Sequence, residues 1–180
     1  MIVTSSFMME PSARSHDPLI MKLRKRTTVV KKHHSVKNNV LNDDVCYIHY
    51  LSPTVAGKKH DKKLADECDY SLPDDAILVQ DTGFQGFTVA NVTILQPKKK
   101  PRNGQLSADE KATNSLISRL RVRNEHAIGG VKRYRIVKDK IRNWKRGFRD
   151  LVIETCCGLH NFRLQFRPWH YDIPDVLLLI

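Results

Sequence analysis

The segment Ala76-Ile-Leu-Val-Gln-Asp81-Thr-Gly-Phe-Gln-Gly86 decides how this chain is expected to fold. Its first half is a continuous apolar run, which is typical of a strand buried on both faces. Asp81 follows the run, at the carboxyl edge where open α/β sheets gather their ligands. The pattern leaves two roles open for Asp81, because an Asp before Gly also commonly caps a turn. A ligand-binding carboxylate and a turn cap are both retained as interpretations.

Strand and helix signals alternate on both sides of this segment. Two β-rich stretches flank the turn residues Asn42-Asp43-Asp44 and predict a hairpin, whose second strand spans residues 45–51. Residues 60–68 predict a short helix, and the pair His60-Asp61 before it is more typical of a cap than of a ligand pair. Residues 91–95 predict another short strand. The expected fold class is therefore α/β.

Two long helices are expected in the second half of the chain. Ser107 and Glu110 have the spacing of a capping box, in which each side chain accepts a hydrogen bond from the backbone of the other residue. The second helix spans about residues 146–166, has an apolar middle that includes His160, and ends before Pro168. The first helix carries apolar residues at roughly helical spacing: Leu116, Leu120, Ala127, Ile128 and Val131.

The charge of the chain points to a polyanionic partner. Its 180 residues include 31 Lys and Arg against 19 Asp and Glu, a net charge of +12, and this balance favours nucleic acid. An anionic membrane is the competing polyanion, but no apolar run reaches the roughly 18 residues that span a bilayer, and we expect a cytoplasmic protein. The cations predicted to contact the phosphates of double-stranded DNA are Lys31, Lys32, Lys98, Lys99, Lys100, Arg121, Lys132 and Arg133.

Glu125 is the second candidate for a functional carboxylate. It lies in a basic helical segment, where it could instead form a surface ion pair with Arg121 one turn earlier. Gly129-Gly130 weigh against a purely structural helix face, because glycine destabilises a helix interior, and close approach of another group would explain them. The four cysteines lack metal-binding spacing and are interpreted as reduced thiols, two of them in a helix core: Cys46, Cys68, Cys156 and Cys157.

Several ordered motifs together resemble a known family, the DDE superfamily endonuclease domain of insertion-sequence transposases, whose eukaryotic relatives are the harbinger transposases. They cover most of the chain and are Lys31-Lys-His-His-Ser-Val-Lys-Asn38, residues 51–63, Asp81-Thr-Gly-Phe-Gln-Gly86, Gln96-Pro-Lys-Lys-Lys-Pro101, residues 114–118 with Arg121, Glu125-His126, Gly130-Val-Lys132 and Cys157-Gly-Leu-His-Asn161.

The resemblance implies a ribonuclease-H-like mixed sheet flanked by helices, with three acidic ligands for Mg²⁺ or Mn²⁺. In the family the ligands lie on the first strand, after the fourth strand and on a late helix. Asp81 matches the second ligand and Glu125 the third, and a complete triad would hold two ions that cleave and transfer DNA strands in transposition. The resemblance also leaves room for a homo-oligomer.

The first ligand departs from the family pattern. Phe7 stands where the family has its Asp, and Glu10 lies three residues further on. We therefore expect an N-terminally truncated copy with impaired chemistry; the alternative is a non-catalytic basic DNA-binding protein. The expected organisation is an irregular lead-in with a remnant of the first strand over residues 1–26, the endonuclease-like domain over residues 27–167, and a tail over residues 168–180.

Overall fold

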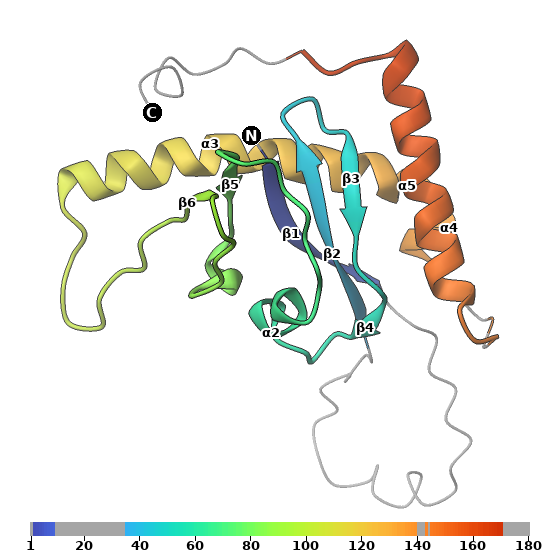
Figure 1. Ribbon diagram of the computed structural model, residues 1–180, viewed down its shortest axis with the longest axis horizontal. Helices are drawn as coiled ribbons and strands as arrows, with labels where there is room; N and C mark the ends of the chain where they lie inside the picture. The colour runs from blue at the N-terminus through green and yellow to red at the C-terminus, as the bar shows by residue number, and fades with distance from the viewer. Residues whose placement is uncertain (1, 10–34, 140–142, 144, 171–180) are drawn as a thin grey trace, which may run out of the picture.

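A computed structural model of the chain describes residues 2–9, 35–139, 143 and 145–170. The described strands form one six-stranded sheet of order β3-β2-β1-β5-β6, with the short β4 paired to β2 (Figure 1). β1 is antiparallel to β2 and parallel to β5, and β5 is parallel to β6. The strands are β1 Ile2–Met9, β2 Val36–Asp43, β3 Ile48–Leu51, β4 Val55–Ala56, β5 Ile77–Val79 and β6 Thr93–Leu95.

β1 is the central strand of the sheet. The expected strand remnant at the start of the chain is a full strand that continues to Met9, because its backbone pairs with all of β2. Residues 2–9 are therefore not irregular, while residues 10–26 of the expected lead-in lie outside the described part. Phe7 lies opposite Asn38 in this register, and Val3 lies beside Val79 of β5.

The helices cover both faces of the sheet and one of its edges (Figure 1). Val40 packs in a core cluster with residues of α3 and α5, whereas its neighbour Leu41 packs in a second cluster on the opposite face. Successive side chains of β5 also lie on opposite faces of the sheet, with Leu78 in the second cluster and Val79 packed against α3. Burial on both faces explains the apolar run of β5. The helices are α2 Asp61–Asp66, α3 Ala108–Lys132, α4 Arg135–Lys138 and α5 Phe148–Phe166.

The predicted capping box at the start of α3 is confirmed. The Ser107 hydroxyl accepts from the Glu110 N–H at 3.1 Å, and the Glu110 carboxylate accepts from the Ser107 N–H at 2.9 Å. The ammonium of Lys98 also bonds this carboxylate, and together these bonds lower the pKa of Glu110. The first turn of α3 is thus tied to the basic loop that precedes it.

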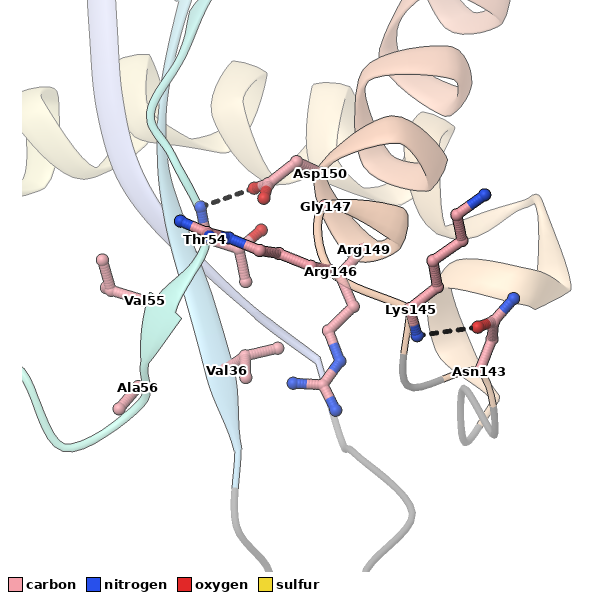
Figure 2. Close-up of a pocket in the computed structure, with 10 residues that line it drawn as sticks. All are labelled: Val36, Thr54, Val55, Ala56, Asn143, Lys145, Arg146, Gly147, Arg149 and Asp150. Carbon is pink, nitrogen blue, oxygen red and sulfur yellow. Dashed lines mark hydrogen bonds between the residues drawn. The ribbon is translucent and has the colours of Figure 1, made fainter.

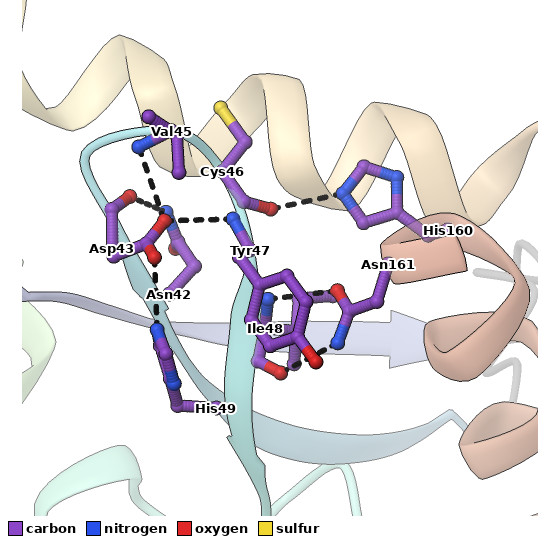
Figure 3. A network of polar contacts seen from close by, with 9 residues as sticks. All are labelled: Asn42, Asp43, Val45, Cys46, Tyr47, Ile48, His49, His160 and Asn161. Carbon is purple, nitrogen blue, oxygen red and sulfur yellow. Dashed lines mark hydrogen bonds and ion pairs between the residues drawn. The ribbon is translucent and has the colours of Figure 1, made fainter. Parts of the chain in front are cut away.

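The predicted hairpin is present, but its second strand begins at Ile48 rather than at residue 45. The intervening residues form a turn around Asp43, whose carboxylate accepts from the N–H groups of Val45 and Tyr47 at 3.0 and 2.8 Å (Figure 3). Cys46 in this turn has a φ of 68°, a left-handed conformation that a strand cannot contain. The side chain of Asp43 therefore delays the start of β3.

α5 is attached to β3 by two consecutive side chains (Figure 3). The Asn161 amide accepts from the Ile48 N–H at 2.9 Å and donates to the Ile48 carbonyl at 2.8 Å. A ring nitrogen of His160, Nε2, bonds the Cys46 carbonyl at 2.9 Å. β3 is the edge strand on this side of the sheet, and such strands expose unpaired backbone groups. The two side chains satisfy backbone groups at that edge and fix α5 beside it.

The cysteines are free thiols throughout the described part of the chain. Cys156 and Cys157 lie in the buried face of α5, as expected. Burial raises the pKa of both thiols, that of Cys157 to about 12. Both therefore remain neutral near neutral pH and pack as small apolar groups. In the same described residues, no helix is long and apolar enough to cross a membrane.

Gly130 of α3 lies directly against the ring of His160, so that a Cβ at this position would stand 2.2 Å from Nδ1. The ring cannot retreat without breaking its hydrogen bond to the Cys46 carbonyl. We expect Gly130→Ala to lower the free energy of unfolding by about 1–3 kcal/mol, measured by urea denaturation, because overpacking forces the core apart.

The matched control is the neighbouring Gly129→Ala. Gly129 is exposed, and nothing lies within 4 Å of the position its Cβ would take. This change should raise stability by up to about 1 kcal/mol through helix propensity. An equal drop in stability in the two variants would contradict the contact between Gly130 and His160.

His160 also predicts how stability depends on pH. Burial lowers its pKa, the charges of Arg133 and Arg163 act in the same direction, and the bond to the Cys46 carbonyl opposes them. The unfolded chain then binds a proton at His160 where the folded chain does not. Stability should therefore fall as the pH drops below about 6.5, by no more than about 1.4 kcal/mol per pH unit from this group.

Urea denaturation of the wild type and of His160→Gln at about pH 7.5 and about pH 5.5 measures this contribution. The variant should lose less stability between the two pH values than the wild type does. If the variant and the wild type lose the same stability between the two pH values, His160 titrates alike in the folded and unfolded chain.

Candidate functional site

Asp81 lies just beyond the carboxyl end of β5, where the chain turns into a short 3₁₀ helix, η1 Thr82–Phe84. Its Oδ1 accepts from the Thr82 N–H at 2.5 Å and from the Thr82 hydroxyl at 3.2 Å. The turn-capping role that the sequence left open is therefore present. The Gln96 amide, just after β6, donates to the Asp81 carbonyl at 2.7 Å, so the backbone of Asp81 is held from the neighbouring strand.

The other carboxylate oxygen of Asp81 bonds a cation. Arg121 Nη2 lies 2.8 Å from Asp81 Oδ2, and the side chains of Arg121 and Asp81 are 28% and 40% exposed. Asp81 is therefore accessible to solvent although both its oxygens have partners. This contact joins the carboxyl edge of the sheet to the middle of α3, and it replaces the surface pair with Glu125 that the spacing had suggested.

Glu125 lies one turn after Arg121 on α3 and is exposed. Residues four apart share a helix face, so Glu125 lies on the side of α3 that Arg121 directs toward Asp81. Among the hydrogen bonds and ion pairs between described residues, none joins Asp81 to Glu125. The structure thus places one predicted carboxylate at the edge of the sheet, with a guanidinium beside it, and the other on α3.

A third carboxylate, Asp61 of α2, lies beside the same turn. Its Oδ1 lies 2.5 Å from Nζ of the buried Lys37, and a Cβ at Gly83 would stand 2.5 Å from its Oδ2. Glycine at position 83 therefore makes room for this carboxylate. His60 takes the N-cap position of α2, although its side chain makes no capping bond. The sequence offered no signal for the pairing with Lys37, which is distant along the chain.

These donors fall short of a two-ion centre. In the parallel register, extending the pairing of Val3 with Val79 by two residues puts Ser5 level with Asp81, and β1 contains no acidic residue from Ile2 to Met9. Over the residues that the structure describes, no group of three His, Cys, Asp or Glu side chains lies close enough to hold a metal ion. The described residues therefore do not by themselves fit a pair of divalent ions.

Five of the predicted DNA-contacting cations lie near the two ends of α3, whereas Arg121 lies in its middle and bonds Asp81. Lys98, Lys99 and Lys100 are exposed in the loop before the helix, and the Asn114 side chain fixes this loop by accepting from the Lys98 N–H at 2.8 Å and donating to the Lys98 carbonyl at 2.9 Å. Residues 132 and 133 are exposed at the other end. Residues 31 and 32 lie outside the described part.

The fold and this edge define a class: an α/β domain that carries its polar groups beyond the carboxyl ends of its central parallel strands. The chain belongs to the DDE superfamily endonucleases, whose family description matches residues 21–161. A relative described as "Probable transposase for insertion sequence element IS702", from Microchaete diplosiphon, is 28% identical over 111 residues, which are 62% of this chain and 40% of the relative. The chain thus matches less than half of that relative's length. No solved structure matches it.

The Arg121 guanidinium competes with any cation for the Asp81 carboxylate. A pair as exposed as this one contributes at most about 1 kcal/mol. We expect Arg121→Gln to strengthen Mn²⁺ binding at Asp81 by up to about fivefold, measured as paramagnetic broadening of the Thr82 amide signal during titration.

Arg119→Gln is the control, because it removes the same charge from α3 two positions earlier, where the side chain faces elsewhere. It should leave the broadening of the Thr82 signal unchanged. Equal strengthening by both variants would mean that general charge, and not the contact between Arg121 and Asp81, governs the cation.

Proposed function

We propose that this chain is a ribonuclease-H-like DNA-binding domain of the transposase type whose metal-dependent strand cleavage is impaired. The observation that carries the proposal is the position of Asp81, which follows β5 at the carboxyl edge of a sheet whose centre, β1, has no carboxylate. The family places one ligand at each of these positions. Glu125 on α3 has the place of the third.

The order of the strands supports the ribonuclease-H-like part of the proposal. Apart from the two-residue β4, the first three strands form an antiparallel meander, and the next two run parallel to β1 on its other side. With β4 left out, β5 is the fourth strand, and Asp81 comes two residues after its last residue, Val79. This is the position that the family pattern assigns to the second carboxylate.

The impairment follows from the number of oxygen donors. Mg²⁺ or Mn²⁺, when bound in pairs, stabilises the attacking and leaving oxygens of a phosphodiester. Asp81 and Glu125 supply two of the three carboxylates expected for that purpose, and Ser5 and Phe7 of β1 supply none. Asp61 does not replace the missing one, because it lies on α2 instead of β1 and its Oδ1 pairs with the buried Lys37.

DNA binding depends on charge that remains in place. The net charge of +12 and the exposed lysines before α3 suit sequence-independent contacts to phosphates. A non-catalytic DNA-binding protein is the second candidate function, and the missing carboxylate of β1 favours it over an active nuclease. The relative described as a probable transposase is matched over only 40% of its length. Strand transfer by this chain is therefore part of the proposal.

Binding of a fluorescent duplex of about 30 base pairs, measured by anisotropy at several salt concentrations, tests the first half of the proposal. The logarithm of the affinity should fall linearly with the logarithm of the salt concentration, by about 0.9 for each phosphate contact. Changing Lys98, Lys99 and Lys100 together to Gln should flatten this slope. A wild-type affinity that does not change with salt would contradict phosphate binding.

Nicking of a supercoiled plasmid in Mg²⁺ or Mn²⁺ tests the second half. We expect little or no nicking by the wild type, and Phe7→Asp should not restore it. Robust cleavage that Asp81→Ala abolishes would contradict the impairment while leaving the assignment to the family intact.

A further inference from the structure

A cationic cavity lies between the start of α5 and the strands β2 and β4, outside the basic tracts that the sequence singled out. It has a volume of about 410 Å³, within the range of ligand pockets. Lys145, Arg146 and Arg149 line it together with one carboxylate, that of Asp150. Figure 2 shows both arginine side chains extending from the start of α5 toward β4 and the start of β2.

Among the described residues that line the cavity, the one carboxylate is already hydrogen-bonded. Asp150 Oδ1 accepts from the Thr54 N–H at 2.7 Å, a bond that attaches the first turn of α5 to the loop before β4 (Figure 2). The Asp150 carboxylate therefore positions the wall of the cavity. Arg146 and Arg149 both line the cavity, so that it carries more positive than negative side chains among the described residues.

The backbone at this end of α5 also favours an anion. Gly147, the N-cap residue, has a φ of 75°, and no side chain caps the helix there. The start of a 19-residue helix carries partial positive charge on its N–H groups. Two arginines, a lysine and this helix end thus act in the same direction.

We propose that this cavity binds a phosphodiester of the DNA backbone, held by Arg146 and Arg149. Guanidinium groups match the oxygens of a phosphate with two parallel hydrogen bonds. A cavity of about 410 Å³ also has room for more than a single phosphate group. The inference rests on the proposed function, since the phosphodiester in the cavity belongs to the same DNA duplex that the chain is proposed to bind near Asp81.

The position of the cavity in the sheet supports this ligand. Val36, in its wall, pairs with Met9 at the carboxyl end of β1, and Asp81 lies beyond the carboxyl end of β5, which runs parallel to β1. β4 lies three strand positions from β5, and Met9 lies four residues beyond the level of Asp81. With spacings of about 4.8 Å and about 3.3 Å, the two places are roughly 20 Å apart. One turn of B-DNA, about 34 Å, spans this separation.

Duplex binding by the full chain tests the inference. Arg146→Gln should weaken binding several-fold and lower the salt slope by about 0.9, the value for a single phosphate, while Arg146→Lys should keep most of the slope. Arg167→Gln is the matched control, because it removes the same charge from an exposed side chain at the opposite end of α5. It should leave the slope unchanged. Thermal unfolding of each variant establishes that it is folded.

The outcomes separate this inference from the proposed function. A wild type that does not bind the duplex overturns both. A wild type that binds with a steep salt slope, while Arg146→Gln and Arg167→Gln behave alike, overturns the cavity alone.

An NMR titration distinguishes the source of the phosphate. Inorganic phosphate and a short DNA duplex should both shift the amide signal of Gly147, and the duplex should displace the phosphate. A shift with inorganic phosphate that the duplex does not compete for would identify a site for a free anion, and would overturn the assignment to DNA.

Discussion

The double hydrogen bond between the Asn161 side chain and the backbone of Ile48 is the contact on which the arrangement of helices and sheet depends. It completes the edge of β3 with a side chain instead of another strand, and the adjacent His160 extends the attachment to Cys46. The same histidine packs against Gly130 of α3. One short segment of α5 thus positions both long helices relative to the sheet, and with them the basic ends of α3 and the cavity at the start of α5.

The second constraint is the parallel pairing of β1 with β5. Because both strands end at the same edge, Asp81 and the cavity beside Val36 face one side of the molecule, although they are far apart in the sequence. Helix α3 is joined to this edge of the sheet by the contact of Arg121 with Asp81. A ligand as long as a DNA duplex can contact several of these groups at once, and a small molecule cannot.

Several features of the fold and of the candidate site could be predicted from local sequence. The apolar run before Asp81, the capping box of Ser107 and Glu110, and the buried cysteines of α5 each depend on neighbouring residues, so periodicity and spacing identify them. The pairing of Lys37 with Asp61, the contact of Arg121 with Asp81 and the room that Gly130 gives His160 depend on segments that meet only in the folded chain. The cavity could not be predicted for the same reason, because Arg146 and Arg149 become a site only when β4 lies opposite them.

Magnitudes indicate which feature limits metal chemistry at this edge. The contact between Arg121 and Asp81 is partly exposed, and such pairs contribute at most about 1 kcal/mol, so a cation or a phosphate can displace the guanidinium. A missing carboxylate is a larger deficit, because divalent ions such as Mg²⁺ require oxygen ligands and the water and phosphate oxygens around them must be held in place. In the proposed function Arg121 therefore only modulates access to Asp81, whereas the composition of β1 decides whether two ions can be held. In the proposed function the phosphate contacts need no metal ligand, so DNA binding would persist where cleavage does not.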